Sequence, residues 1–399
     1  MAQNFDDLPE LWEWKEIAEV FDVRDGTHDS PKYQDEGYPL ITSKNLGVEG
    51  LHFKKVKFIS EVDYEAINKR SKVDKGDMLF AMIGTIGNPT IIDIEPSFAI
   101  KNVALFKPKS DLATMQHLKY VLQSPRVLSK MLGEAKGATQ KFVGLTYLRK
   151  FRIPLPPKAE QERIVAKLDA LFSRIDKAIA HLKHTHSQSK ALSKASSNLC
   201  FDQLDSTKAE LGTIVDFKNG YAFKSKDFCD SGVPVLRISN IQKGGIDYGR
   251  MTYVPDNTIN DKTEQFYVEP NEIVIAMSGA TTGKIAMNDT GKRLLQNQRV
   301  GRFIIKCETL RNFVFLFLET KVEENLQQAL GAAQPNLSTK QIKELQIPLP
   351  PLAEQQKIVA KLDALSAKCR ALETATSQQL ERLESLKASL LDTAFKGKL

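Results

Sequence analysis

Polar, flexible segments carry most of the side chains that could do chemistry in this chain of 399 residues. Arg, Lys, Asn and Gln can pair bidentately with base edges, and Gly, Ser and Thr let backbone N–H groups approach phosphates. Such segments more often only turn the chain, so what favours nucleic-acid binding is their recurrence at matched positions in two halves of the sequence. The candidate contacts in the first half are Arg24, Thr27, His28, Thr42, Ser43, Lys44, Asn45, Thr85, Lys101, Asn102, Gln140 and Lys141. Those in the second half are Lys218, Asn219, Tyr221, Lys224, Arg237, Ser239, Asn240, Ser278, Thr281, Thr282, Lys284, Gln296, Asn297, Arg299, Gln334 and Asn336.

Two further patterns resemble catalytic sites but depart from them in detail. Gly279–Lys284 is one residue short of a P-loop between its glycines, and Ile285 stands where Ser or Thr would bind Mg²⁺. Asp93, Glu95 and Lys101 match no nuclease spacing, and the second half has no counterpart to them. The Asn/Asp-Pro-Pro-aromatic motif of amino-methyltransferases does not occur. The sequence therefore predicts a chain that is not an enzyme.

Histidine and cysteine spacings do not predict a metal site. His181, His184 and His186 are separated by three and two residues, so they cannot all share one helix face, and a solvated basic patch is expected there. The cysteines are far apart and form no C-x-x-C pair, which argues against a zinc module or a disulfide scaffold and is typical of a reducing compartment: Cys200, Cys229, Cys307 and Cys369.

The net charge is +7, from 56 Lys and Arg against 49 Asp and Glu, with 42% hydrophobic residues. A modest excess of this kind suits a folded protein with one or two basic faces, for which nucleic acid is the leading partner. The stretches Lys54–Lys57 and Lys69–Lys72 are expected to face phosphates or solvent. The first residues are acidic, and no apolar run could span a bilayer, so a soluble, cytoplasmic protein is expected.

The chain repeats itself once. Residues 153–171 (IPLPPKAEQERIVAKLDAL) and 347–365 (IPLPPLAEQQKIVAKLDAL) are identical at 16 of 19 positions, 194 residues apart. Weaker matches extend upstream, where Met82 aligns with Met277 and Asn102 with Asn297. A period of this length is too long for a solenoid and indicates a duplication of whole domains. The two copies agree in the constant blocks and diverge elsewhere, as expected if each variable block recognises something different.

Each constant block reads as a proline lead-in followed by a long helix with an a/d seam typical of a coiled coil. The expected seam positions are Ile164, Leu168, Leu171, Ile175 and Leu182, then Ile358, Leu362, Leu365, Leu372, Leu383, Leu386 and Leu390. Thr376 and Gln379 are expected to interrupt the second seam. Two separate surface helices are the alternative, but each seam lacks another partner, so an antiparallel pair is favoured. The apolar cluster Leu390, Leu391 and Phe395 should dock on the N-terminal domain or on another subunit.

The variable blocks contain short β-branched and aromatic runs followed by helical stretches, which predicts compact α/β domains. The expected fold is α+β, with two α/β target-recognition domains related by pseudo-two-fold symmetry and joined by two long antiparallel coiled-coil helices. The expected boundaries are residues 1–152 and 206–346 for the domains, and 153–205 and 347–399 for the helices.

The doubled IPLPP-x-AEQ-x-x-IVAKLDAL block, each copy following a variable domain, resembles the specificity subunit of type I restriction–modification systems. The ending Leu390–Leu399 (LLDTAFKGKL) resembles that family's C-terminus, and DGTHDSP, PLITSKNL and FAMIGTIGNP resemble phrases of its target-recognition domains. The likeness covers essentially the whole chain. One departure is that the first helix ends SSNLCFDQL (Ser196–Leu204) rather than repeating AFKGKL, which indicates that the two docking surfaces differ.

The resemblance implies a phage-defence function in which each variable block reads one half of a split, asymmetric sequence in double-stranded DNA. The helices would set the gap between the halves and dock two modification subunits, which would use S-adenosylmethionine to methylate adenine. Restriction subunits would add ATP- and Mg²⁺-dependent cleavage, and this chain would hold no cofactor itself. Two other classes remain as alternatives: a self-contained methyltransferase or nuclease, and a structural coiled-coil adaptor.

Overall fold

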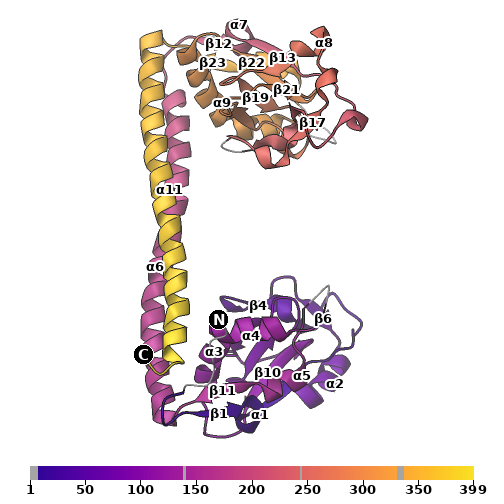
Figure 1. Cartoon of the computed structure of the whole chain (residues 1–399), viewed down its shortest axis with the longest axis vertical. Coiled ribbons are helices and arrows are strands. Elements are labelled where there is room, and N and C mark those ends of the chain that lie inside the picture. The colour runs from indigo at the N-terminus through magenta and orange to yellow at the C-terminus, as the bar shows by residue number, and fades with distance from the viewer. Residues whose placement is uncertain (1–7, 138–140, 243–244, 330–336) are drawn as a thin grey trace. The chain divides into compact units, whose positions relative to one another are not determined.

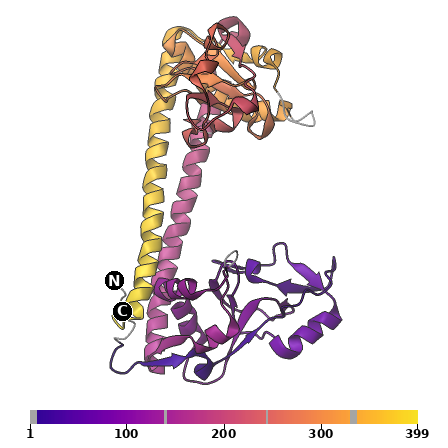
Figure 2. The ribbon, with the colours of Figure 1, turned by 45° about the vertical axis from the view of Figure 1, so that its right-hand side comes forward.

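A computed structural model describes residues 8–137, 141–242, 245–329 and 337–399. The chain divides into two compact units, of which the first extends to Lys183 and includes Ser377–Leu399, and the second is His184–Thr376. Each unit combines an α+β domain with parts of two long helices (Figure 1, Figure 2). Within the described ranges, no helix is both long and apolar enough to cross a lipid bilayer.

The first unit is built on a four-stranded antiparallel sheet with the strand order β2-β10-β7-β8, beside a smaller sheet with the order β6-β3-β9. Its strands are β1 (Glu13–Glu16), β2 (Phe21–Asp25), β3 (Tyr38–Ile41), β4 (Leu46–Gly47), β5 (Gly50–Leu51), β6 (Lys57–Ile59), β7 (Met78–Ala81), β8 (Gly87–Ile91), β9 (Ala99–Ile100), β10 (Val103–Pro108) and β11 (Arg152–Leu155). Its helices are α1 (Ile17–Val20), α2 (Glu61–Ser71), α3 (Met115–Gln123), α4 (Pro125–Glu134) and α5 (Leu145–Lys150), with a 3₁₀ turn η1 (Ser43–Asn45).

Strand β7 shows why the larger sheet lies at the centre of this domain. Its four residues are all buried, and they alternate between two apolar clusters. Met78 and Phe80 face the cluster shared with α3 and α4, whereas Leu79 and Ala81 face the cluster shared with the smaller sheet. Because side chains alternate across a strand, a continuously apolar run requires cover on both faces. The sheet therefore lies between helices and a second sheet.

The second unit repeats this arrangement, with sheets in the order β13-β22-β19-β20 and β17-β14-β21-β18. Its strands are β12 (Lys208–Glu210), β13 (Asp216–Asn219), β14 (Val233–Leu236), β15 (Ile241–Gln242), β16 (Gly245–Ile246), β17 (Thr252–Val254), β18 (Tyr267–Val268), β19 (Ile273–Ala276), β20 (Ile285–Met287), β21 (Leu294–Gln296), β22 (Val300–Ile304) and β23 (Gln346–Pro348). Its helices are α7 (Leu211–Ile214), α8 (Asp261–Glu264), α9 (Glu308–Ala329) and α10 (Thr339–Lys343). Short 3₁₀ turns are η2 (Ser225–Asp227), η3 (Ile238–Asn240), η4 (Tyr248–Arg250), η5 (Asp256–Thr258) and η6 (Gly279–Thr281). Two repeated α+β domains are thus confirmed.

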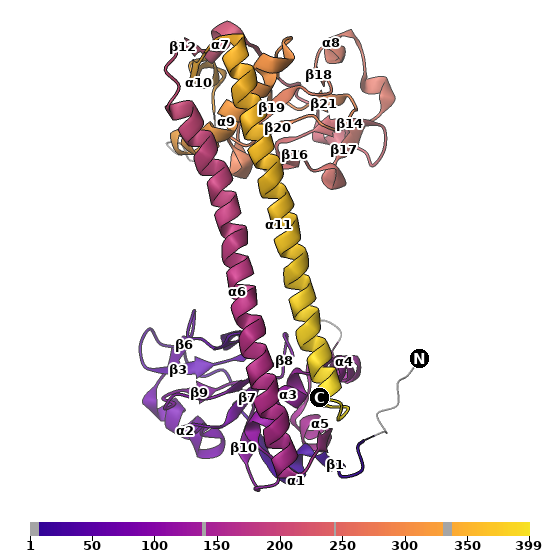
Figure 3. The ribbon, with the colours of Figure 1, turned by 90° about the vertical axis from the view of Figure 1, so that its left-hand side faces the viewer.

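The long helices are α6 (Lys158–Asp202) and α11 (Leu352–Ala394), which pack side by side (Figure 3). In the first unit, the start of α6 meets the end of α11, where Ile164 and Leu168 share a cluster with Leu391. In the second unit, the hydroxyl of Ser189 on α6 donates to the carbonyl of Cys369 on α11, at 3.3 Å. The expected antiparallel pair of long helices is confirmed. The expected domain boundaries were placed where the constant and variable blocks of the repeat meet, and they stay a prediction.

Two of the expected seam positions are wrong. Leu372 and Leu386 are 43% and 45% exposed, so they lie off the seam. Thr376, expected to interrupt the seam, is instead 3% exposed within it, and its hydroxyl lies 3.1 Å from Nδ1 of His186. The sequence pattern favoured Leu372, three residues after Cys369, because it is apolar. The buried position is instead the polar Thr376, seven residues after Cys369. The remaining expected positions are buried or half-buried.

The apolar C-terminal cluster docks on the first domain. Leu391 is buried beside Trp12 and Tyr120, and the ring of Phe395 lies 5.6 Å from that of His117. Burial lowers the pKa of His117 to about 4, so this imidazole is neutral at physiological pH. In the second unit, Phe201 near the end of α6 packs in the same way against α9. The two helix ends therefore match in structure despite their different sequences.

Candidate nucleic-acid interface

A glycine opens the first candidate loop of each domain. A β-carbon on Gly26 would lie 2.3 Å from the carbonyl oxygen of Ile100, and one on Gly220 would lie 2.1 Å from that of Asn297. No side chain fits either position, so each loop can press its backbone against the end of β9 or the residue that follows β21. In the second domain, the amide of Tyr221 then donates to the carbonyl of Gln296 at 2.9 Å. The two domains thus bring the same pairs of loops together.

A buried asparagine shapes the next loop in each domain. The side-chain oxygen of Asn45 accepts from the amide of Thr42, and that of Asn240 accepts from the amide of Arg237, both at 3.0 Å. Both asparagines are less than 5% exposed, and their amide groups donate to backbone carbonyls further along the loop. Their hydrogen-bonding capacity is therefore used inside the domain. They position the neighbouring residues of the loop rather than present themselves to a ligand.

In the first domain, the loops surround a hollow of about 740 Å³. It collects these residues of the expected set: Thr42, Ser43, Lys44, Asn45, Thr85, Lys101 and Asn102. The hollow also has a lysine-rich wall, and among the described residues no Asp or Glu lines it. The lysines of this basic hollow are Lys44, Lys54, Lys55, Lys57 and Lys101. Lysines gathered without carboxylates favour an anionic ligand, and a phosphate backbone is one that basic loops commonly bind.

His28 lies beside the basic hollow, and its ring is held in one orientation by two hydrogen-bond partners. Its Nδ1 is 2.8 Å from Oδ1 of Asn102, which lines the hollow, and its Nε2 is 2.9 Å from Oδ2 of Asp25. The hydrogen bond with Asn102 raises the pKa of His28, and Asp25 raises it further. Asp25 itself also pairs with Arg70. Oxygen atoms beside both ring nitrogens favour the protonated form of the ring, while its side chain stays largely open to solvent.

The other expected residues of the first domain lie in different settings. Thr27 bridges to Lys101, and the carbonyl of Lys141 accepts from the amide of Gly84 at the edge of the basic hollow. Arg24 lies on β2, where its guanidinium pairs with Asp22 and donates to a backbone carbonyl. Its charge is therefore engaged within the domain. Gln140 lies outside the described residues.

In the second domain, several expected cations are tied to neighbouring loops. Arg237 donates to the hydroxyl of Thr252 at 3.0 Å, Lys284 to the side chain of Gln242 at 3.1 Å, and Arg299 to the hydroxyl of Ser278 at 3.1 Å. Lys218, Lys224 and Ser239 are exposed, and the side chains of Asn219 and Thr339 are hydrogen-bonded to each other. Gln334 and Asn336 lie outside the described residues.

Tyr221 forms an aromatic group in the second domain. Its ring centroid lies 5.0 Å from that of Phe223 and 5.4 Å from that of Phe266, and the residue is 37% exposed. An exposed ring supported by two others is suited to stacking against a base. Gln296 lies behind it, fully buried, and donates to the carbonyls of Lys218 and Val300. Asn297 pairs with Tyr221 in an isolated β-bridge, whereas Ser278, Thr281 and Thr282 lie at the turn η6, with Ser278 and Thr282 buried.

Matched positions of the two domains carry different side chains. The turn η1 follows Thr42 and presents Lys44, whereas the equivalent turn η3 follows Arg237 and presents Ser239. Strands β9 and β21 are equivalent in the two domains. Lys101, the residue directly after β9, is matched by Gln296, which is the buried last residue of β21. A common backbone thus holds two different sets of donors and acceptors.

The sequence predicted only that the lysines of residues 54–57 face phosphates or solvent. It did not indicate Tyr33 and His52, which also line the basic hollow. The ammonium of Lys57 lies 4.0 Å from the ring centroid of Tyr33, which fixes both side chains on one wall. The run of lysines at residues 54–57 could have indicated this wall, but nothing in the spacing of the run predicts that it lies opposite residues 42–45. Across the described ranges, no three His, Cys, Asp or Glu side chains gather to hold a metal ion.

Comparison with known proteins identifies the family. The model of the type I restriction modification DNA specificity domain matches residues 9–183 and again 204–382. The MjaVIII type I restriction enzyme specificity subunit of Methanocaldococcus jannaschii is 25% identical over 98% of this chain and 94% of its own length. The EcoAI specificity subunit of Escherichia coli is 24% identical over 95% of this chain and 82% of its own length.

Solved structures share the fold. One, from work on complex assembly and conformational transition of the type I R-M system, superposes with a TM-score of 0.78 over 98% of this chain and all of its own, at 19% identity. The HsdS subunit of Thermoanaerobacter tengcongensis gives 0.59 over the full length of both chains, at 20% identity. With two matched repeats and two loop-bearing domains on paired helices, this chain belongs to the DNA specificity subunits of type I restriction–modification systems.

Proposed function

We propose that the two domains read the two halves of one bipartite, asymmetric DNA sequence, and that the chain positions modification and restriction subunits on that site. The observation that carries this proposal is the difference between side chains held on a matched backbone. One domain offers a lysine-rich hollow with His28, and the other offers Tyr221 and Arg237. Unlike contacts predict unlike half-sites, so the whole sequence is not a palindrome.

The proposal assigns catalysis to the partners, in the cytoplasm. The relatives are named as specificity subunits of restriction enzymes, and the role that fits such a subunit here is to grip DNA while a neighbouring subunit acts on an extruded adenine. S-adenosylmethionine would then be held by two modification subunits, and ATP and Mg²⁺ by restriction subunits. This chain's contribution would be sequence recognition and spacing.

Mapping methylated adenines tests the proposal directly. The chain is co-expressed with a candidate modification subunit, and the expected result is methylation within one split, non-palindromic sequence. Arg237→Ala should relax the bases required in one half only, because one domain reads each half. Lys44→Ala combined with Lys101→Ala should weaken binding to DNA and reduce its salt dependence.

Lys361→Ala, an exposed lysine on α11, serves as the matched control and should leave both the methylated sequence and the affinity unchanged. Methylation by this chain alone would contradict the proposal. So would a modification subunit whose methylated sequence is the same in the presence and absence of this chain.

A further inference from the structure

The two long helices begin with the same glutamine device. Nε2 of Gln161, in the first turn of α6, donates to the carbonyl of Pro156 at 2.9 Å. Nε2 of Gln355, at the matched position of α11, donates to the carbonyl of Pro350, also at 2.9 Å. Both side chains are buried. Each glutamine thus locks the proline lead-in onto its helix, and each has an oxygen left to satisfy.

In the first unit, the loop between β10 and α3 satisfies that oxygen. The amide of Thr114 donates to Oε1 of Gln161 at 3.0 Å, and Nε2 of Gln161 also donates to the carbonyl of Leu112 at 2.7 Å. The hydroxyl of Ser110, in the same loop, lies 3.5 Å from the carbonyl of Val20 on α1. This loop therefore covers both the helix start and α1.

The equivalent loop of the second unit is four residues shorter. Phe106 and Phe303 occupy matched positions in the sheets, and Thr114 and Cys307 each accept the first hydrogen bond of the following helix. Thr114 comes eight residues after Phe106, but Cys307 comes only four residues after Phe303. Among the described residues, no donor lies within hydrogen-bonding distance of Oε1 of Gln355. A buried acceptor without a partner costs free energy that a ligand's N–H group would recover.

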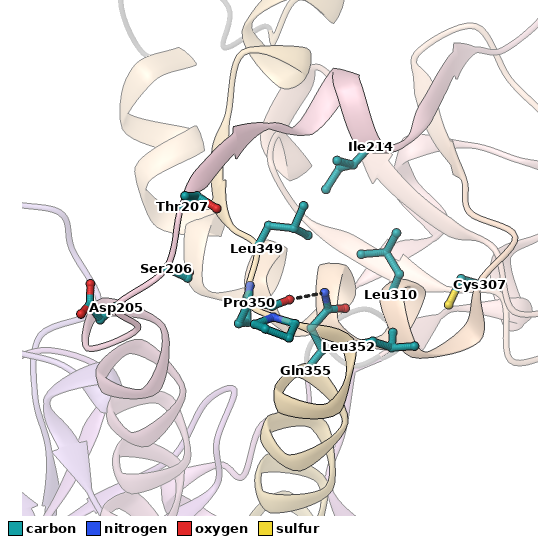
Figure 4. A pocket seen from close by; sticks show the side chains of 11 residues that line it. Asp205, Ser206, Thr207, Ile214, Cys307, Leu310, Leu349, Pro350, Leu352 and Gln355 are labelled. Carbon is teal, nitrogen blue, oxygen red and sulfur yellow. Dashed lines mark hydrogen bonds between the residues drawn. The ribbon is translucent and has the colours of Figure 1, made fainter.

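Where the first unit has the longer loop, the second unit has a hollow of about 600 Å³ at the start of α11 (Figure 4). Its apolar lining comes from Ile214 on α7, the counterpart of Val20, and from Leu310, Leu349 and Leu352. Gln355 lies at its edge, bonded to Pro350. The hollow therefore combines an apolar wall with the unpaired side-chain oxygen of Gln355. Asp205, Ser206 and Thr207 also line it, and the buried hydroxyl of Ser206 likewise has no partner among the described residues.

We propose that this hollow is a socket for an extended loop of a partner polypeptide, which donates a backbone N–H to Oε1 of Gln355 and packs an aliphatic side chain against Ile214 and Leu310. The proposal rests on the assembly with modification subunits proposed above and deepens it by naming one contact. Because the first unit fills the equivalent position with its own chain, the socket exists at one end only. The two partner-docking surfaces are then unequal in composition.

Cys307 reports on the socket because it is exposed and lines the hollow. In the assembled complex, alkylation of Cys307 followed by peptide mass spectrometry should be slowed at least tenfold relative to the free chain. The test variant inserts Lys-Ser-Asp-Leu, the sequence of residues 109–112, between Lys306 and Cys307 to fill the socket. Its affinity for the modification subunit should fall about tenfold, as expected for loss of one buried hydrogen bond and its packing.

Two further variants keep the test decisive if the insertion impairs folding. Gln355→Met removes the acceptor while retaining apolar volume, and it should weaken partner binding about tenfold. The matched Gln161→Met should leave partner affinity unchanged, because Gln161 bonds only within its own unit. A four-residue Gly/Ser insertion after exposed Gly291 is the control for added length.

Equal alkylation of Cys307 in the complex and in the free chain would overturn the socket, even where the bipartite methylation is intact. Protection that appears in the free chain as it dimerises would also overturn it, because the occupant would be a second copy. A complex that protects Cys307 but methylates no split sequence would support the socket and contradict the function proposed above.

Discussion

At the scale of single residues, hydrogen bonds set the charge that the first domain presents. The two ring nitrogens of His28 each face an acceptor oxygen, and the residue adjoins the lysine-rich hollow. Such an arrangement stabilises the imidazolium form, which adds one positive charge near the lysines. The charge of this surface therefore depends on pH in a range where Lys and Arg do not titrate.

Asn102→Ala tests this arrangement. The hydrogen bond with Asn102 is the largest cause of the raised pKa of His28, so the variant should lower that pKa toward its ordinary value of about 6.5. Because the folded-state pKa is raised, the stabilising contribution is complete below the unfolded value and is lost as pH rises through the folded one. NMR titration of the His28 ring protons measures the pKa directly. An unchanged value in the variant would contradict the assignment.

The paired glutamines give a second prediction at this scale. Gln161→Met leaves three backbone groups without their partner, on Thr114, Leu112 and Pro156, and should cost about 2–4 kcal/mol of unfolding free energy. Gln355→Met breaks one hydrogen bond and removes an unsatisfied acceptor, so its cost should stay within about 1 kcal/mol. Urea unfolding of the two variants provides the comparison, and equal losses would refute it.

At the scale of elements, the seam of the long helices determines which leucines stabilise the pair. Leu168 and Leu362 are buried in the clusters that join helix to domain, whereas Leu372 and Leu386 are half exposed. The central part of the pair instead buries Thr376 and Ser189. Polar seam residues lower stability but restrict the helices to one register, since another register would leave their hydrogen-bonding groups unpaired.

Alanine substitutions distinguish these positions. Leu168→Ala and Leu362→Ala should each lower the unfolding free energy by about 2–5 kcal/mol, because they leave cavities in packed clusters. Leu372→Ala and Leu386→Ala should change it by less than about 0.5 kcal/mol, as for other exposed sites. Thermal and urea unfolding measure both sets. A large loss at Leu372 would place it in the seam after all.

At the scale of the whole molecule, α6 is the covalent link between the two recognition domains, and α11 packs along it. If the two domains read two half-sites, as proposed above, the length of these paired helices should set the gap between the half-sites. At about 1.5 Å per residue, the 45 residues of α6 measure roughly 67 Å. Length along this pair should then translate into base pairs of DNA.

Inserting one heptad into both helices, after Lys183 and after Gln379, should lengthen the pair by about 10 Å while keeping the seam on the same face. The unspecified gap in the methylated sequence should then grow by about three base pairs, at 3.4 Å each. Methylome mapping of the variant measures the gap. An insertion of three residues, which rotates the seam, is the control expected to disrupt the pair. A gap of unchanged length would show that the helices do not set it.

The sequence by itself determined the duplication, the two α+β domains and the antiparallel helices, because these depend on periodic patterns that one chain displays. An a/d seam can be recognised locally, and sixteen identical positions in nineteen identify a repeat without a structure. Residues 42–45, 85 and 101–102, which the sequence singled out as candidate DNA contacts, line one hollow in the structure. Their contact with DNA stays a prediction.

Only the tertiary structure decided which side chains remain available within those loops. Asn45, Asn240 and Gln296 read as donors in sequence, yet their side-chain NH₂ groups donate to backbone carbonyls within the domain. The partner of Asn45 is 7 residues away and one partner of Gln296 is 78 residues away. Gln355 is the opposite case, because its side-chain oxygen has no partner, which only a comparison with its paired counterpart Gln161 reveals. The oxygen of Gln161 and the NH₂ group of Gln296 have partners 47 and 78 residues away, so composition and spacing do not encode this hydrogen-bond satisfaction locally.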